Sequence, residues 1–409
     1  MWKGRAMSKK AMNRRKFITE CSLKLAGAGL LLRETAAKTA FGEEKKPKSK
    51  PKKKQEPDME YRTLGKTGLK VSAVSFGTMR VREPAVLFKA LDLGINFFDT
   101  AQDYPNEDII GKVAKEYGRE KVLIATKIYP FETINKASEK YIVHESKVLD
   151  LMMEDSLKRL QSDYIDVLYV HSVVDRNCLL NEDLLVFLEK VKKEGTVRFV
   201  GASLHNLTVL ADVTDHFIKS NIFDVLLTVF NSASPPEHSE LLKRARKAQV
   251  GIVAMKTQTG GYEDGFDRSV SPHQASLKWV LNHDFVDCAI PGMVNREQVV
   301  ENAGVVGKKV GWSDRKTLHA YHNAIKHQYC LMCGKCSSTC GTAINIPTIN
   351  RALMYCEGYQ DFALGQKTYR GLSTRENGLS CMSCSLPTCH CVNSIKIAER
   401  MKQAHALFA

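Results

Sequence analysis

The chain has 409 residues, of which 44% are hydrophobic and 26% charged, and its formal net charge is +15. This balance is typical of a globular protein and excludes a fibrous or wholly disordered chain. The length allows one large α/β domain plus a smaller one, and no apolar run approaches the roughly 20 residues of a spanning helix, which excludes a polytopic membrane protein.

The positive charge is concentrated at the N-terminus. Residues 1–58 contain 17 Lys and Arg against 6 Asp and Glu, a balance of +11 that leaves +4 for the rest of the chain. The basic character therefore says little about the folded body, and we expect no nucleic-acid partner.

Residues 1–40 have the order of an export signal. A basic region with Asn13-Arg14-Arg15-Lys16-Phe17-Ile18 precedes a weakly apolar stretch over residues 21–32 and the small pair Ala36-Ala37. This order resembles a twin-arginine signal, whose substrates cross the membrane folded and often with a redox cofactor inserted. We expect export through the twin-arginine translocase to a periplasmic or other extracytoplasmic location; a basic disordered tail is the alternative.

Residues 41–58 form a Lys/Pro-rich linker. The stretch from Glu43 to Asp58 holds seven lysines, three prolines and no large apolar residue, so it cannot bury a core and should be extended and disordered. A second interpretation is peripheral contact with an anionic membrane through its lysines.

From residue 59 onward, short β-rich runs alternate with amphipathic helical stretches. We expect strands at residues 70–76, 95–98, 122–126, 165–170, 197–200, 224–229, 250–254 and 286–290. Eight such units over residues 59–315 predict an α/β fold of the (β/α)8 TIM-barrel type. A doubly wound sheet is the rival, but the first β/α turn has no glycine-rich dinucleotide fingerprint.

Four polar side chains follow successive predicted strands, where the strand ends of a barrel converge. They are Asp99, Tyr104, Lys127 and His171. The set suits carbonyl reduction by hydride: a phenol protonates the alkoxide, an ammonium lowers the phenol pKa, a carboxylate holds the ammonium, and an imidazole orients the carbonyl oxygen. Each residue alone has an ordinary structural explanation, such as a helix cap or a buried ion pair.

Residues 59–305 resemble the aldo-keto reductase family. The matching stretches are Tyr61–Val71, Gly94–Ala101 with Tyr104 following, Ser156–Asp166 leading to His171, and Ile290–Gly292 leading to Glu301 and Asn302. The resemblance implies a NAD(P)-dependent oxidoreductase acting on a small carbonyl or alcohol, with Asp99, Tyr104, Lys127 and His171 as its catalytic tetrad and Tyr104 as the general acid.

By the same resemblance, a set of positions would bind the nucleotide: Ser203, Thr228, Met255, Lys256, Gly292, Arg296, Gln298, Glu301 and Asn302. Gly292, Met293 and Gln298 stand where many NADPH-dependent members have lysine, serine or threonine, and arginine. Those cations pair with the 2′-phosphate, so preference for NADP over NAD stays open, with Arg296 and Lys256 as the nearby cations that would compensate.

Nine of the twelve cysteines lie in the predicted second domain, residues 316–409. The first run, Cys330, Cys333, Cys336 and Cys340, has the spacing of bacterial-type [4Fe–4S] ligation, in which the fourth cysteine serves the other cluster. The second run, Cys381, Cys384, Cys389 and Cys391, differs only in its third position. With this exchange, one cluster takes Cys330, Cys333, Cys336 and Cys391, and the other takes Cys381, Cys384, Cys389 and Cys340.

Two alternatives for the cysteines remain, namely a disulfide scaffold and zinc. Cys356 is left over as a small buried residue, and His390 is a substitute ligand for Cys389. A subgroup of aldo-keto reductases resembles this chain in carrying a C-terminal ferredoxin-like domain, which implies two 4Fe-4S clusters here.

These features together predict an exported, periplasmic oxidoreductase. A barrel exchanging a hydride between NAD or NADP and a carbonyl or alcohol would be coupled through two iron–sulfur clusters to electron transfer with a redox partner protein. The alternatives are a nucleotide-independent barrel fed by the clusters and a non-enzymatic electron carrier.

Overall fold

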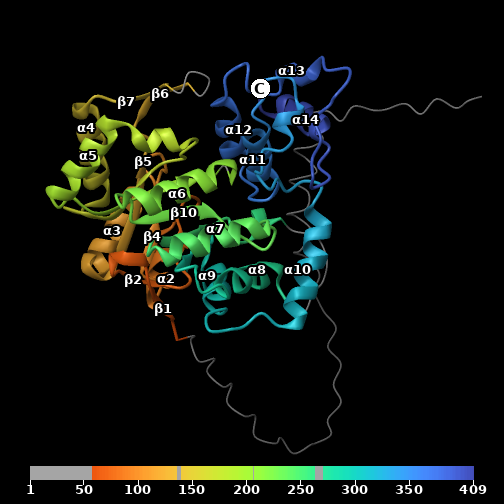
Figure 1. Ribbon diagram of the computed structural model, residues 1–409. Helices are drawn as coiled ribbons and strands as arrows, with labels where there is room; N and C mark the ends of the chain where they lie inside the picture. The colour runs from red at the N-terminus through yellow and green to blue at the C-terminus, as the bar shows by residue number, and fades with distance from the viewer. Residues whose placement is uncertain (1–57, 136–139, 206, 263–269) are drawn as a thin grey trace, which may run out of the picture. The chain divides into compact units, whose positions relative to one another are not determined.

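The computed structural model describes residues 58–135, 140–205, 207–262 and 270–409 (Figure 1). The fold below is that of the described residues within the compact unit Gln55–Ala409. The predicted export signal, and the predicted linker up to residue 57, lie outside the described residues. Among the described helices, none has the length and apolar character needed to cross a membrane.

Eight parallel strands form the central sheet, in the order β12-β11-β10-β9-β8-β5-β4-β3. They are β3 (Phe76–Gly77), β4 (Phe97–Asp99), β5 (Leu123–Ile128), β8 (Ile165–Val170), β9 (Val197–Leu204), β10 (Val225–Val229), β11 (Gly251–Met255) and β12 (Cys288–Ala289). Bridges between Val74 and Ala289 and between Gly77 and Gly292 join the first strand to the last. The predicted α/β barrel is confirmed as a nearly closed ring of eight strands.

Helices follow the strands along the chain. They are α2 (Pro84–Asp92), α3 (Glu107–Tyr117), α4 (Ser146–Leu160), α5 (Glu182–Lys193), α6 (Leu210–Ser220), α7 (Pro236–Lys247), α8 (Pro272–Leu281) and α9 (Arg296–Ala303). Their starts have local causes: the side chains of Asn181, Ser271 and Asn295 cap α5, α8 and α9, and α2, α7 and α8 begin with proline, which fits the first helical turn.

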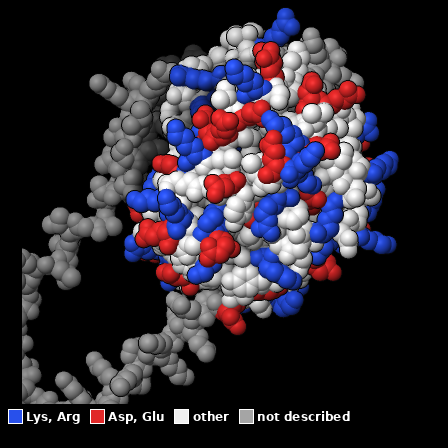
Figure 2. Space-filling model, turned by 90° about the vertical axis from the view of Figure 1, so that its left-hand side faces the viewer, with Lys and Arg blue, Asp and Glu red and all other residues white. Residues whose placement is uncertain are grey.

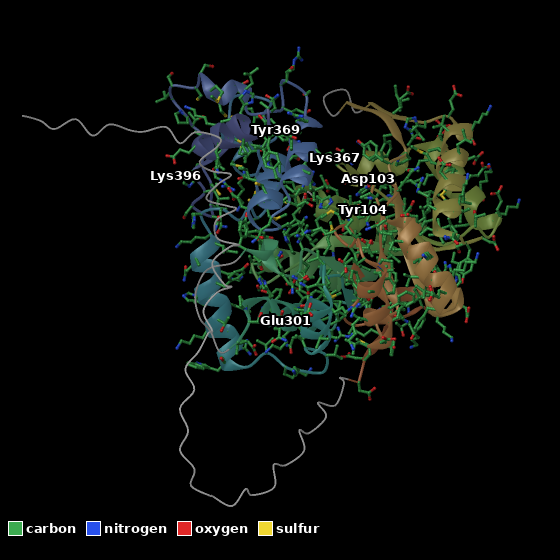
Figure 3. The ribbon with its side chains drawn as sticks, turned by 180° about the vertical axis from the view of Figure 1, so that it is seen from behind. Asp103, Tyr104, Glu301, Lys367, Tyr369 and Lys396 are labelled. Carbon is green, nitrogen blue, oxygen red and sulfur yellow. The ribbon has the colours of Figure 1, made fainter. Side chains whose placement is uncertain are left out.

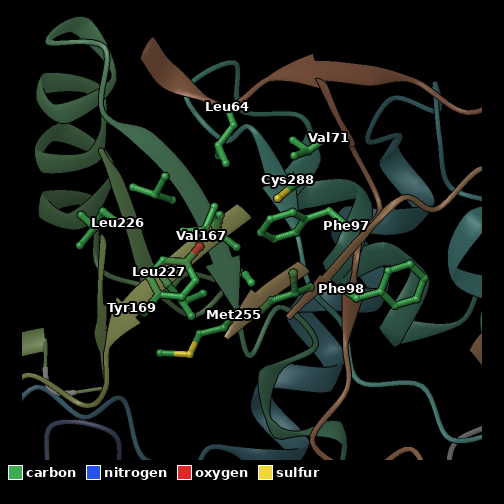
Figure 4. Close-up of a cluster of buried hydrophobic side chains, with 14 of the residues drawn as sticks. Leu64, Val71, Phe97, Phe98, Val167, Tyr169, Leu226, Leu227, Met255 and Cys288 are labelled. Atoms are coloured by element: carbon green, nitrogen blue, oxygen red, sulfur yellow. The ribbon is translucent and has the colours of Figure 1, made fainter. Parts of the chain in front are cut away.

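The core lies where the strands face one another. Figure 4 shows Phe97, Val167 and Leu227 meeting inside the ring, and all three are fully buried. Burial of each such side chain stabilises the fold by about 1.5–3 kcal/mol. The buried carboxylate of Asp166 lies at the start of β8 and is compensated by Arg119 at 3.0 Å and Arg198 at 2.6 Å.

The first predicted strand, residues 70–76, is not continuous. Lys70–Ser72 forms β2, which pairs antiparallel with β1 (Tyr61–Thr63) in a separate hairpin. The barrel strand begins only at Phe76, because the chain bends at Ala73; the Ser75 hydroxyl donates to the Ser72 carbonyl across this bend at 2.7 Å. The alternating pattern of the sequence spans this bend and does not reveal it. A second hairpin, β6 (Phe131–Asn135) with β7 (Lys140–Val143), precedes α4.

The C-terminal segment is helical. It contains α10 (Trp312–Ile325), α11 (Ile346–Glu357), α12 (Phe362–Arg370), α13 (Leu379–Met382) and α14 (Ile397–Phe408). All residues from 270 to 409 are described, and none after Ala289 lies in a strand. Leu353, Met401 and Phe408 meet in a small core of its own. The ferredoxin-like prediction for this segment therefore rests on its cysteine spacing and not on a sheet.

This C-terminal segment packs on the barrel through tyrosines and glycines. The Asn231 amide donates to the Tyr329 hydroxyl at 2.8 Å, and the Tyr321 hydroxyl donates to the Tyr262 carbonyl at 2.9 Å. Gly358 approaches the loop after β11 so closely that a Cβ atom there would lie 2.2 Å from the carbonyl oxygen of Gly260. A residue larger than glycine at position 358 would therefore separate the two surfaces.

Candidate active site

The four predicted catalytic residues come together at the carboxyl ends of the barrel strands. Asp99 ends β4, Tyr104 lies in the turn before α3, Lys127 lies in β5, and His171 follows β8. The Lys127 ammonium donates to the Asp99 carboxylate at 2.6 Å and to the Thr100 carbonyl at 2.5 Å, and both charged side chains are almost fully buried. Burial raises the pKa of Asp99, and Lys127 opposes this shift.

Tyr104 lies against both the lysine and the histidine. The Lys127 nitrogen is 5.1 Å from the centre of its ring, and its ring meets that of His171 edge to face with centroids 6.2 Å apart. Burial, and next the Asp99 carboxylate, raise the pKa of Tyr104 well above its ordinary value. The phenol therefore holds its proton at neutral pH, as a group that donates a proton to a reacting oxygen requires.

His171 is a neutral imidazole in this setting. Burial, followed by the charge of Lys127, lowers its pKa to about 4, although Asp103 acts in the opposite direction. The Nδ1 atom of His171 is 3.6 Å from the Asp103 carboxylate, whose side chain is 58% exposed. A neutral imidazole beside the phenol can orient a carbonyl oxygen without releasing a proton of its own.

The low pKa of His171 sets an expected pH profile for any carbonyl reduction at this site. Protonation would place a second positive charge beside Lys127, so kcat/KM should stay level from pH 8 down to about pH 5 and fall only as pH approaches 4. Because Asp103 raises this pKa, Asp103→Asn should move the acid limb to still lower pH. An acid limb near the ordinary histidine value of about 6.5 would contradict this assignment.

A cleft of about 470 Å³ extends from the tetrad toward α9. Among the residues lining it are Asp99, Tyr104 and Lys127 at one end and the predicted nucleotide contacts Met255, Lys256, Gly292, Gln298, Glu301 and Asn302. Figure 3 labels Tyr104 and Glu301 at separate places on the barrel. The volume is in the range of cofactor and small-molecule sites, so one continuous cleft can accommodate parts of a nucleotide and a substrate.

Three predicted nucleotide contacts do not line this cleft. Ser203 is buried and its hydroxyl accepts a hydrogen bond from the Ser172 amide at 2.8 Å. Thr228 is also buried, and its hydroxyl has no partner in the described part of the chain. Arg296 is exposed at the start of α9. The carboxamide oxygen of Asn302 is 2.8 Å from the Gln258 amide, which donates to it.

Sequence reasoning missed the contribution of the C-terminal segment. Tyr355, Gly358, Tyr359 and Gln360 line the same cleft as the tetrad. The ammonium of Lys256, predicted to face the nucleotide, donates to the Tyr355 hydroxyl at 3.4 Å and lies 5.0 Å from the centre of that ring. No motif marks these residues, because their role depends on how the segment packs on the barrel.

The eight cysteines predicted as cluster ligands form two groups of four in the C-terminal segment. Cys330, Cys333, Cys336 and Cys391 line one small cavity. Burial, and then its neighbours Cys336, Cys391 and Cys333, raise the pKa of Cys330 to about 12.

The other group is Cys381, Cys340, Cys389 and Cys384. Burial of Cys381, followed by the influence of the other three, raises its pKa to about 11. These eight thiols are free, forming no disulfide. Cys356 packs against the nearby apolar core instead, and the His390 backbone amide donates to the Thr339 hydroxyl.

Within the described residues, no three His, Cys, Asp or Glu side chains lie close enough together to hold one metal ion.

Comparisons with known proteins agree on the barrel. Residues 77–269 match the aldo/keto reductase family. An uncharacterised oxidoreductase of Bacillus subtilis, YrpG, is 33% identical over 231 residues, which are 51% of this chain and 69% of that protein. A probable voltage-gated potassium channel beta subunit of Arabidopsis thaliana is 41% identical over 129 residues, 28% of this chain and 37% of its own length. This chain therefore spans only about a third of that plant relative.

Two solved structures share the fold. An aldo-keto reductase from Bacillus halodurans has a TM-score of 0.53 at 22% identity, covering 64% of this chain and 96% of that one. An aldo-keto reductase from Klebsiella pneumoniae in complex with NADPH has a TM-score of 0.51 at 22% identity, covering 64% of this chain and 95% of that one. The similarity is confined to the fold.

Proposed function

Because the chain belongs to the aldo/keto reductase family and is an oxidoreductase, we propose that it exchanges a hydride between a nicotinamide nucleotide and a carbonyl or alcohol, coupled to electron transfer through two [4Fe–4S] clusters. The observation that carries the hydride proposal is the continuous cleft, with Asp99, Tyr104 and Lys127 at one end and Glu301 and Asn302 at the other.

The residues of the tetrad have separate tasks in this proposal. When bound, the nicotinamide supplies the hydride. Tyr104 donates its proton to the oxygen of the substrate carbonyl as the alcohol forms. Lys127, fixed by Asp99 at 2.6 Å, lies over the face of Tyr104 and stabilises the phenolate that remains. His171, neutral and adjacent to Tyr104, holds the carbonyl oxygen in place.

In this proposal the nucleotide extends toward α9, and its outer contacts at positions 292 and 298 are uncharged. Gly292 and Gln298 line the cleft there, whereas Arg296 is exposed and Lys256 is in contact with Tyr355. We therefore include both NAD and NADP in the proposal. The Klebsiella pneumoniae neighbour in complex with NADPH supports the use of a nicotinamide nucleotide.

Two groups of four free thiols support the cluster proposal. Their membership is the crossed arrangement that bacterial ferredoxin spacing implies, with Cys391 beside Cys330 and Cys340 beside Cys381. When bound, the clusters would supply one-electron transfer between the barrel and a redox partner protein. In this proposal the cysteines hold the clusters within a helical segment that also lines the cleft.

We further propose export through the twin-arginine translocase to the periplasm, with the lysine-rich linker contacting anionic membrane. Cluster insertion before export would protect the cysteines from oxidation to disulfides. On the face shown in Figure 2, Lys and Arg alternate with Asp and Glu, and no nucleic-acid partner is included in the proposal.

Anaerobic titration of the purified chain with NADH and with NADPH, in separate cuvettes, tests the coupling. We expect one nucleotide at least to be oxidised while the visible iron–sulfur absorbance bleaches, and the more effective nucleotide then identifies the preference. If neither nucleotide binds while dithionite still bleaches the absorbance, the hydride proposal is wrong. The orphaned hydroxyl of Thr228 and the uncharged outer contacts would then favour a barrel that receives electrons only from the clusters.

A further inference from the structure

Cationic and polar side chains outside the tetrad converge on the same barrel mouth. Arg351 and Tyr355 lie four residues apart on α11 and therefore project from the same face of that helix. Lys256 follows β11, and His205 follows β9. Helix α11 thus places Arg351 and Tyr355 at the same barrel mouth as Lys256 and His205.

The interactions of these groups show how close they are. Lys256 contacts Tyr355 and lies 5.8 Å from the centre of the Tyr359 ring. Burial acts to raise the pKa of Tyr355, but Lys256 and Arg351 together lower it below its ordinary value. After burial, Arg351 is the strongest influence that lowers the pKa of His205.

Two positive side chains at this mouth have no carboxylate partner among the described residues. Lys256 and Arg351 form no ion pair with any carboxylate in the described segments. The Nε atom of Arg351 and the Nδ1 atom of His205 are buried without a hydrogen-bond partner among the described residues. The Nε atom of Arg351 is a donor, and buried donors are normally satisfied, so this position favours an acceptor as its partner.

The position of Lys256 and Arg351 indicates that the missing acceptor belongs to a substrate and not to the nucleotide. Tyr355 lines the cleft together with Asp99, Tyr104 and Lys127, and Arg351 lies one helical turn before Tyr355 on α11, so its charge lies on the side of the reacting end of the cleft. Glu301 and Asn302, two of the expected nucleotide contacts, belong to α9 and line the cleft there. Asp103, the carboxylate that faces His171, is mostly exposed and forms no ion pair with Arg351 or Lys256 in the described part of the chain.

We propose that Arg351, Lys256 and Tyr355 bind a carboxylate of the substrate, so that the substrates are carbonyl acids or the corresponding hydroxy acids. The inference rests on the proposed function for its carbonyl chemistry. The carboxylate keeps its charge and forms no covalent bond, while the carbonyl carbon gains a hydride from the nicotinamide and the carbonyl oxygen gains a proton from Tyr104. An arginine, a lysine and a phenol together match the acceptor geometry of a carboxylate.

Matched substrate pairs test the inference with the full chain carrying its cofactors. The pairs are succinic semialdehyde with butanal, and 4-carboxybenzaldehyde with methyl 4-formylbenzoate. We expect kcat/KM to favour the carboxylate member of each pair. Arg351→Gln should reduce that preference about 10- to 100-fold, as expected for a hydrogen bond to a charged group. Arg351→Lys should recover part of it, and Arg375→Gln, at an exposed site of the same segment, should leave it unchanged.

Calorimetric binding of 4-(hydroxymethyl)benzoate, compared with 4-methylbenzyl alcohol, gives a readout that does not need turnover. Arg351→Gln should weaken binding of the acid at least tenfold. If no aldehyde is reduced but the acid binds through Arg351, the proposed function fails and the anion site stands. Equal turnover of both members of each pair, unaffected by Arg351→Gln, overturns the inference alone. A loss confined to the affinity for NADH or NADPH assigns the site to the nucleotide diphosphate and also overturns it.

Discussion

Tyr104→Phe is expected to abolish carbonyl reduction. The substitution removes the proton donor and leaves the ring between Lys127 and His171 in place, so turnover should fall about 10²- to 10⁴-fold. The affinity for nucleotide should change little, because the tyrosine hydroxyl acts on the substrate oxygen. The measurements are nucleotide oxidation with a carbonyl substrate and a fluorescence titration of bound nucleotide.

The matched control is Tyr117→Phe. Tyr117 ends α3 and is 36% exposed. The substitution removes the same hydroxyl group as Tyr104→Phe, but from a residue that does not line the cleft. It should retain full turnover. Dithionite reduction of the clusters should be the same in wild type and Tyr104→Phe. Retention of carbonyl reduction by Tyr104→Phe would remove Tyr104 as the general acid and support a different proton donor.

Cys336→Ser is expected to remove one cluster. Cys336 is the most buried cysteine of its group and lines the cavity shared with Cys330, Cys333 and Cys391. Loss of one thiolate from a four-ligand set should reduce bound iron from about eight to about four atoms per chain, with a matching loss of visible absorbance. Iron analysis and low-temperature electron paramagnetic resonance of the dithionite-reduced chain measure the change.

The control for this experiment is Cys356→Ser, the same substitution at a cysteine outside both groups. It should leave the iron content unchanged. A chain that contains zinc, or that shows disulfides by thiol titration after anaerobic purification, would contradict the cluster assignment. Iron content that is equally low in both variants would show that Cys356 takes part in holding a cluster.

The barrel was predictable because each buried strand of a parallel sheet is a continuous apolar run. Residues 165–170, for example, were expected as a strand and form β8. The failure at residues 70–76 has a specific cause. The chain bends at Ala73, where the Ser75 hydroxyl is bonded to the Ser72 carbonyl, and the pattern of apolar residues continues through that bend.

Some residues of the candidate site could also be predicted from the sequence, and others could not. Asp99, Lys127 and His171 could be placed from the sequence because they lie at or next to the carboxyl ends of strands that meet. Arg351 and Tyr355 could not, because their spacing reveals only that they share one helix face. Which surface that face contacts depends on the complementary shape of residues far away in the chain. For the same reason, the sequence could not show that Thr228 is buried and does not line the cleft.

The contact between Gly358 and Gly260 restricts how this chain can be recombined with its relatives. A side chain at position 358 would overlap the Gly260 carbonyl, and Gly260 itself adopts φ +81°, a conformation that favours glycine. A chimera that grafts the cysteine segment onto another barrel must therefore transfer the loop after β11 as well. The two segments form one transplantable module, although nearly one hundred residues separate them in the chain.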